Sequence, residues 1–186
     1  MFNKEAKNIL LQLAKDSIDY GLHHHRSIPV HVNEYPADLQ DNRACFVTLK
    51  LNDQLRGCIG SLTAYRPLVE DVANNAYAAA FEDPRFPAVS NSEFQKLHYH
   101  ISVLSVPQEF PVTSEDDLLS KLQVGEDGLI LTDNGYRATF LPSVWESLSS
   151  PKQFVTELKR KAGLPMDYWS DTIQFQRYRA ENIEME

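Results

Sequence analysis

The chain has 186 residues, enough for one domain or for a larger unit with a small one appended. Hydrophobic residues make up 42% and aromatic residues 10%, which is enough for a packed core. The formal net charge of −8 argues against a nucleic-acid backbone or an anionic membrane as the main partner, because both require clustered lysine and arginine.

The N-terminal residues carry charges of both signs and no long apolar run, which indicates that no signal peptide is present. No stretch approaches the roughly 18 apolar residues of a membrane span. We therefore expect the protein in the cytoplasm. Two cysteines, Cys45 and Cys58, are too few for a disulfide framework, and both are expected to be free thiols.

The first third of the chain predicts a helix, a loop and a hairpin. Asn3 is a suitable N-cap, an apolar face with helical spacing follows, and Gly21 is the expected stop. Residues 23–42 hold two prolines and three adjacent histidines without a period, which is typical of a loop. Alternating residues 44–51, a turn at Asn52 and a strand over 55–60 predict a β-hairpin.

A helix is then expected to begin at Pro67 and to end at Asp83, before Pro84. Capping signals predict further helices after Ser90, Ser114 and Ser150. Strands are expected over 97–106, 129–132, 136–141 and 172–182, and a short helix over 142–148. Because hairpins pair the strands without strict β-α-β order, we predict an α+β fold, with a mixed or antiparallel sheet flanked by helices.

The segment Leu55-Arg56-Gly57-Cys58-Ile59-Gly60 resembles the signature hexapeptide of the AMMECR family, whose prokaryotic branch is called AmmeMemoRadiSam system protein A. The similarity continues over Phe46-Val47-Thr48-Leu49, Asp83-Pro84-Arg85-Phe86-Pro87 and Lys161-Ala162-Gly163-Leu164-Pro165. It spans roughly residues 5–182, so residues 1–186 are expected to form a single AMMECR-type domain.

The resemblance implies a larger subdomain and a smaller antiparallel β subdomain, with boundaries left open and the hexapeptide lining a cleft between them. It also implies a Memo-like protein and a radical SAM protein as partners. The family has no settled activity that would transfer to this chain. The substrate, the reaction and the oligomeric state, including a homodimer, stay open.

The hexapeptide is the predicted site, with Cys58 and Arg56 as catalytic candidates. Residues two apart on a strand share a face, so Arg56, Cys58 and Gly60 are expected to point the same way. A guanidinium beside a thiol favours the thiolate, which is the nucleophilic form. The alternative is that Cys58 is a small buried residue and that the glycines mark a bulge.

Five residues are candidates for substrate binding: Gly57, Gly60, Asn75, Asp83 and Arg85. The glycines would let a ligand approach the backbone. The other three would supply an amide, a carboxylate and an anion-binding guanidinium. The alternative for Asp83 and Arg85 is a helix-terminating loop held by its own ion pair.

No metal site or cofactor is evident from the sequence. Adjacent histidines at His23, His24 and His25 cannot all face one metal ion. His98 and His100 share a strand face and would supply half of a metal site, although a half-buried sheet face explains them equally well. A glycine-rich phosphate loop is also absent from the sequence.

Two functional hypotheses follow. The first is a small enzyme, or an enzyme component, that uses the Cys58 and Arg56 cleft on a small, anionic substrate. The second is a non-catalytic adaptor that binds a ligand or a partner protein through the same cleft. A nucleic-acid regulator is disfavoured, because the chain is acidic and has no basic stripe.

Overall fold

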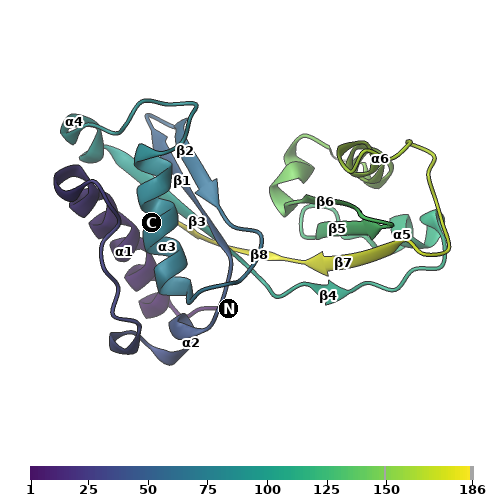
Figure 1. Cartoon of the computed structure of the whole chain (residues 1–186), viewed down its shortest axis with the longest axis horizontal. Coiled ribbons are helices and arrows are strands. Elements are labelled where there is room, and N and C mark those ends of the chain that lie inside the picture. The colour runs from purple at the N-terminus through teal and green to yellow at the C-terminus, as the bar shows by residue number, and fades with distance from the viewer. Residues whose placement is uncertain (149, 185–186) are drawn as a thin grey trace. The chain divides into compact units, whose positions relative to one another are not determined.

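The computed structural model describes residues 1–148 and 150–184. The chain divides into two compact units (Figure 1). Unit 1 consists of Met1–Leu104 and the C-terminal segment from Glu181, and unit 2 of Ser105–Ala180. Each unit has one four-stranded antiparallel sheet with helices packed on it, which confirms the predicted α+β fold. No helix within the described ranges has the length and apolar character needed to cross a membrane.

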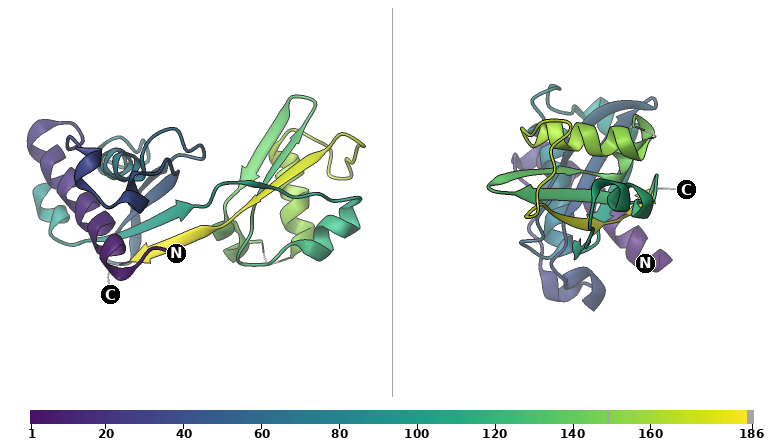
Figure 2. Two further views of the ribbon diagram at one scale, coloured as in Figure 1. Left: turned by 90° about the horizontal axis from the view of Figure 1, so that it is seen from below. Right: turned by 90° about the vertical axis from the view of Figure 1, so that its right-hand side faces the viewer.

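The sheet of unit 1 has the strand order β2-β1-β3-β8. Its strands are β1 Cys45–Leu51, β2 Gln54–Gly60, β3 Leu97–Leu104 and β8 Ala180–Glu184. Two long helices, α1 Lys4–His24 and α3 Leu68–Phe81, pack against each other and cover one face of the sheet (Figures 1 and 2). Shorter helical turns are the 3-10 turn Val32–Glu34, α2 Ala37–Gln40 and α4 Asn91–Phe94.

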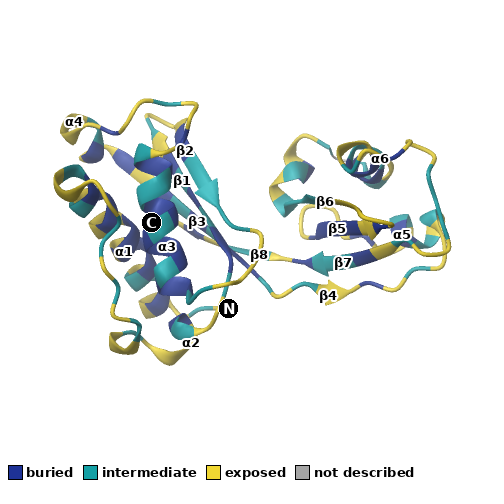
Figure 3. Ribbon diagram, in the orientation of Figure 1, coloured by how far each residue is buried: buried dark blue, intermediate teal, exposed yellow. Residues whose placement is uncertain are grey.

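Alternation along the strands determines which side chains enter the core of unit 1. In β1, the buried residues are Cys45, Val47 and Leu49, and the residues between them are only partly buried. β3 repeats the pattern with Leu97, Tyr99, Ile101 and Val103. The apolar core therefore lies between the sheet and the two long helices, as the buried residues in Figure 3 show.

The expected helix stop at Gly21 is wrong. Helix α1 continues to His24 and ends at His25, which adopts the left-handed conformation at φ 54°. Gly21 serves instead for close packing, because a Cβ there would lie 2.6 Å from the Phe81 ring and 2.7 Å from the Tyr77 ring. A glycine inside a helix thus marks the point where α1 approaches α3, not the end of the helix.

The predicted hairpin of β1 and β2 is confirmed, and its turn requires residues that tolerate positive φ. Asn52 and Asp53 have φ of 51° and 62°, the conformation that a two-residue type I′ turn requires. The register then shifts, since Leu49 faces Gly57 whereas Lys50 faces Leu55. Arg56 is therefore the extra residue of a β-bulge, which alters the direction of its side chain relative to regular alternation.

Unit 2 has the strand order β4-β7-β5-β6. Its strands are β4 Gln108–Glu109, β5 Gly128–Asp133, β6 Tyr136–Phe140 and β7 Gln174–Tyr178. Its helices are α5 Glu115–Lys121, the 3-10 turn Pro142–Glu146 and α6 Pro151–Lys161. The predicted hairpin at Asn134 and Gly135 is confirmed, with both residues at positive φ. Stacked rings of Trp145 and Phe154, 3.9 Å apart, lie in the core.

The single strand expected over 172–182 is wrong. This segment forms β7 in one sheet and β8 in the other, with a break at Arg179. Regular alternation already fails within β7, because Phe175 and Tyr178 are both buried although they are three residues apart. Backbone at Arg179 bonds to Ser105 instead, which ends the pairing of β7.

Candidate functional site

The face of the unit 1 sheet opposite α1 and α3 carries polar side chains from all four strands. We call it the open face and define it by Phe46, Thr48, Lys50, Cys58, His98, His100, Ser102, Asn182 and Glu184. All of these residues are half-buried or exposed. Polar and titratable side chains on the open face are therefore accessible to solvent, whereas the core face of the sheet is buried.

Cys58 belongs to the open face, and Thr48 is its cross-strand partner. Cys58 is half-buried, whereas Cys45 is completely buried. The Thr48 hydroxyl lies 3.2 Å from the Cys58 sulfur, within hydrogen-bonding distance for a thiol. The alternative that Cys58 is an enclosed core residue is thus not what the structure shows, and that description fits Cys45 instead. Burial raises the pKa of the Cys45 thiol well above its ordinary value.

Asp83 and Arg85 hold the backbone of Cys58. Because β2 is an edge strand, its outward N–H and C=O groups have no neighbouring strand. The Cys58 N–H donates to Asp83 Oδ2 at 2.9 Å, and Arg85 Nη2 donates to the Cys58 carbonyl at 3.3 Å. The two side chains also pair with each other at 2.7 Å. We call this arrangement the edge clip.

The Asp83 carboxylate is the buried centre of the edge clip, with a side chain that is 2% exposed. Its pKa lies well below the ordinary value, chiefly because Arg85 donates to it and also because the Cys58 N–H does. Arg85 itself is half-exposed. The ion pair expected under the alternative interpretation is therefore present, and both side chains also contact the backbone of Cys58.

Arg56 does not contact the thiol in the part of the chain that the structure describes. Its Nε donates to Glu93 Oε1 at 2.8 Å and its Nη2 to the Pro87 carbonyl at 2.9 Å, and its side chain is only 8% exposed. Hydrogen bonds from Arg56 first, and from Ser90, lower the pKa of Glu93 to about 2. The bulge thus directs Arg56 into a buried ion pair with α4, which leaves activation of Cys58 by Arg56 without a supporting contact.

Protein atoms fill the space beside both glycines of the hexapeptide. A Cβ at Gly57 would lie 2.0 Å from the Ala79 carbonyl oxygen of α3, and a Cβ at Gly60 would lie 2.3 Å from the Phe46 ring. Gly57 therefore permits β2 to pack directly on α3. The expected approach of a ligand to these two backbone positions has no open space to support it.

Asn75 lies in a different network. Its amide donates to the Cys45 carbonyl at 3.1 Å and to Asp71 Oδ2 at 3.0 Å. Asp71 also accepts from Arg66 Nε at 2.7 Å. Asn75 lies within α3, whereas Asp83 follows the end of that helix at Phe81. The structure thus brings Asp83 and Arg85 to Cys58 but places Asn75 in the buried support of the start of β1.

The histidines have separate surroundings. His24 stacks on Tyr20 with ring centroids 4.0 Å apart, and His23 contacts the Asp19 carbonyl at 2.9 Å. His98 and His100 both belong to the open face of β3. Among the described residues, no group of three or more histidine, cysteine or carboxylate side chains is placed to hold a metal ion.

The model of the AMMECR1 family matches residues 11–183. The chain belongs to the AMMECR1 family. It is 34% identical to protein MJ0810 of Methanocaldococcus jannaschii, over 82% of this chain and 78% of that protein. It is 34% identical to protein TK0174 of Thermococcus kodakarensis, over 98% and 91% of the two chains.

The fold is also found in a solved structure. The crystal structure of uncharacterized protein PH0010 from Pyrococcus horikoshii matches with a TM-score of 0.82 at 32% identity. The match covers 97% of this chain and 92% of that chain. These relatives establish the family and the fold, and their names state no activity.

Two residues that contact the hexapeptide are not evident as site residues from the sequence. Thr48 lies in a segment without a chemical signal of its own, although its place opposite Cys58 follows from the hairpin register. Glu93 has the sequence signal of a helix-capping residue, and it fills that role while pairing with Arg56. No local pattern indicates the second partnership, because 37 positions separate the two residues.

Proposed function

We propose that this AMMECR1-family protein is a small enzyme, or an enzyme component, whose reactive group is the Cys58 thiol on the open face. The substrate is a small anion-bearing molecule, and Arg85 is the group that attracts its charge. The observation that carries the proposal is the edge clip, which holds the backbone of Cys58 at both its N–H and its C=O.

The edge clip has the properties that a positioned nucleophile needs. A reacting atom must be held within a fraction of an ångström and still be accessible. Here the backbone of Cys58 is fixed by a buried carboxylate, while the residue is only partly buried and its thiol lies beside Thr48. A buried carboxylate is unfavourable unless it is paired, and Asp83 pairs with both the Cys58 N–H and Arg85, which supports a fixed position for Cys58.

Arg85 suits the role of anion binding better than Arg56 does. The Arg56 side chain is buried in its pair with Glu93, whereas the Arg85 side chain is 53% exposed and also contacts the Cys58 carbonyl. A guanidinium next to the thiol would hold a carboxylate or phosphate group of a substrate by charge-assisted hydrogen bonds.

The proposal includes the cytoplasm as compartment and a Memo-like protein and a radical SAM protein as partners, on the strength of the family resemblance. No cofactor of the protein's own is part of the proposal. In the proposed reaction, the Cys58 thiol acts on a small substrate.

The test is replacement of Cys58 in cells that depend on this protein. We expect Cys58→Ala and Cys58→Ser to abolish its function while thermal unfolding stays unchanged, because a half-exposed position tolerates both residues. Arg85→Gln should weaken function through substrate affinity. Full function in cells that carry Cys58→Ala would refute the proposal. Glu82→Gln, an exposed change next to the edge clip, is the matched control.

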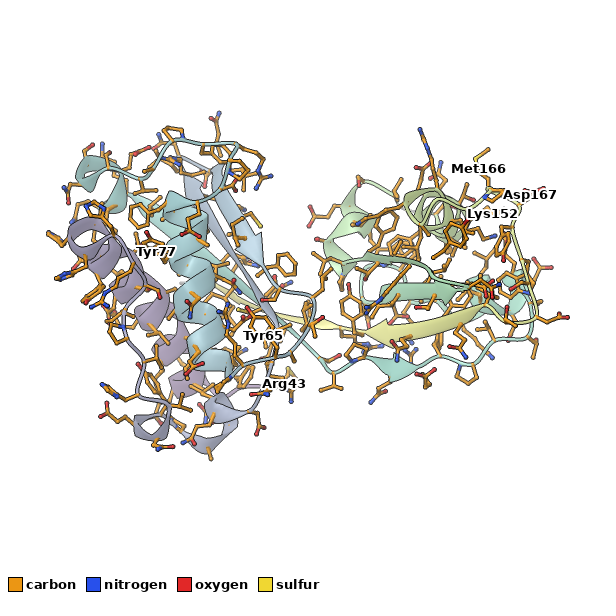
Figure 4. All side chains as sticks on the ribbon, viewed as in Figure 1. Arg43, Tyr65, Tyr77, Lys152, Met166 and Asp167 are labelled. Carbon is orange, nitrogen blue, oxygen red and sulfur yellow. The ribbon has the colours of Figure 1, made fainter. Side chains whose placement is uncertain are left out.

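A non-catalytic adaptor remains the second candidate, and exposed apolar side chains favour it. Leu62 and Tyr65, in the loop after β2, are 45% and 61% exposed. Tyr65 is labelled in Figure 4. Exposed apolar side chains close together in one loop, such as these two, are typical of partner binding. Under this hypothesis, Leu62→Asp should abolish co-purification with a partner protein, whereas Cys58→Ser should leave it intact.

A further inference from the structure

Four side chains of different chemistry lie in one row across the open face. Cys58 in β2 faces Thr48 in β1, and Thr48 faces His100 in β3. His100 Nε2 lies 3.7 Å from Glu184 Oε1 in β8, the next strand. The row therefore runs perpendicular to the strands in the order thiol, hydroxyl, imidazole, carboxylate. Figure 1 shows the four strands that carry it.

The spacing of the row suits proton transfer. The Thr48 hydroxyl is 3.2 Å from the Cys58 sulfur and is able to accept from the thiol while donating elsewhere. Thr48 and His100 are directly opposite in antiparallel strands, so their Cβ atoms lie roughly 4.5–5.5 Å apart and their side chains are neighbours on the same face. Two strand spacings, about 10 Å, separate the backbones of Cys58 and His100.

We propose that Thr48 and His100 are a proton relay for Cys58, with Glu184 supporting the charged imidazole. The proposal rests on the proposed function, since it adds the general base that a cysteine nucleophile requires. In the relay step, the thiol proton moves to the Thr48 oxygen as the hydroxyl proton of Thr48 passes toward His100. The products are a Cys58 thiolate and a His100 imidazolium, with Thr48 unchanged and the net charge conserved.

Neighbouring groups agree with this assignment of charge. Glu184 Oε1 lies 3.7 Å from His100 Nε2, where its negative charge stabilises the imidazolium that the relay forms. On the β1 side, Lys50 is opposite His98, one pair further along the sheet. The positive charge of Lys50 therefore lies diagonal to His100 and beside Thr48, where it opposes the imidazolium less than a direct neighbour would.

The experiment measures the rate at which iodoacetamide alkylates each cysteine of the full chain, by mass spectrometry of the peptides. Only a thiolate reacts, so the rate near pH 7 reports how readily Cys58 loses its proton. Cys45 is the internal control, since it is completely buried and should not react in the native protein.

We expect His100→Asn and Thr48→Val to slow the alkylation of Cys58 about tenfold near pH 7. At about pH 10, all variants should react at the same rate, because the thiol ionises there without a base. Thr48→Ser keeps the hydroxyl and should react like the wild type. His98→Asn is the matched control on the same strand and face, and it should also be silent.

Unchanged rates near pH 7 in both His100→Asn and Thr48→Val would overturn the relay. An equal loss in His98→Asn would overturn it too, because the effect would then belong to the charge of the whole face. A persistent difference at about pH 10 would show a distorted site and would count against the relay as well. None of these results bears on the cell phenotype of Cys58→Ala, so failure of the relay is distinguishable from failure of the proposed function.

Discussion

The ion pair of Arg56 and Glu93 provides the sharpest test of how the hexapeptide is held. The Arg56 side chain is 8% exposed and the Glu93 side chain 27%. Glu93→Gln removes the negative charge but keeps an oxygen that accepts from Ser90 in the capping box. The substitution therefore leaves a buried guanidinium without its counter-charge and preserves the cap of α4.

The magnitude follows from the pKa of Glu93, which falls from 4.5 to about 2 in the folded protein. A depressed carboxyl pKa contributes stability that is present above the unfolded value and lost as the pH falls toward the folded value. The difference corresponds to about 3 kcal/mol at pH 7 and about 1.5 kcal/mol at about pH 3. Removal of one partner from a buried pair costs a similar amount, about 3–5 kcal/mol.

The assay is urea unfolding of wild type and Glu93→Gln at both pH values, followed by far-ultraviolet circular dichroism. Both long helices, α1 and α3, belong to unit 1, so this signal reports mainly on the unit that holds the pair. Both tryptophans, Trp145 and Trp169, lie in unit 2, and their fluorescence shows whether the second unit is affected.

The control is Glu82→Gln, which removes an exposed charge from the end of α3 and should change the free energy of unfolding by less than about 0.5 kcal/mol. A Glu93→Gln protein as stable as the wild type at pH 7 would refute the reasoning. So would a loss of equal size at both pH values, because the charge of Glu93 would then not be its source.

Three further predictions concern the packing and pairing of other residues. Gly57→Ala should destabilise unit 1 by about 3 kcal/mol or more, since the added Cβ would meet the Ala79 carbonyl oxygen. Urea unfolding followed by circular dichroism measures the loss of stability. In the control Gly125→Ala, the added Cβ enters open space, and only the strained φ costs about 1 kcal/mol. Asp83→Ala should speed amide hydrogen exchange at Cys58 and lower the free energy of unfolding by about 1.5–3 kcal/mol, because the Cys58 N–H loses a charged acceptor. Unchanged protection of the Cys58 amide in a hydrogen-exchange experiment would contradict the edge clip. Glu115→Gln should destabilise unit 2 by about 3–5 kcal/mol, since Lys159 is completely buried and pairs with Glu115. Tryptophan fluorescence during urea unfolding measures the loss of stability. The control is Glu157→Gln, which breaks an exposed pair with Arg160 and should have almost no effect.

Local patterns in the sequence predict most elements of this protein. Capping residues before α4 and α5, turn residues in the two hairpins and alternation in β1 and β3 act over a few residues, so a short window contains the whole cause. The errors occurred where distant contacts decide. Gly21 predicts a helix end from the local sequence, but its actual role is to let Phe81 and Tyr77 pack closely against α1.

The same distinction applies to the candidate site. The hexapeptide, with Cys58 on a strand, is evident in the sequence, and so is the pairing of Asp83 with its near neighbour Arg85. Arg56 illustrates the limit, because regular alternation places it beside Cys58 whereas a bulge and the remote Glu93 direct it into a buried pair. Gly57, next to Arg56, is a local signal for the bulge, as the alternative interpretation held, but the remote partner Glu93 has none.

The sequence by itself determined the family, the α+β class and the segment that bears the thiol, because each depends on residues close together in the chain. Tertiary structure alone decided what surrounds the thiol. Thr48 and His100 reach the row of Cys58 through strand register, and Asp83 and Arg85 reach its backbone because β2 is an edge strand. Register and edge position are properties of the assembled sheet, set by pairing between segments far apart in the chain.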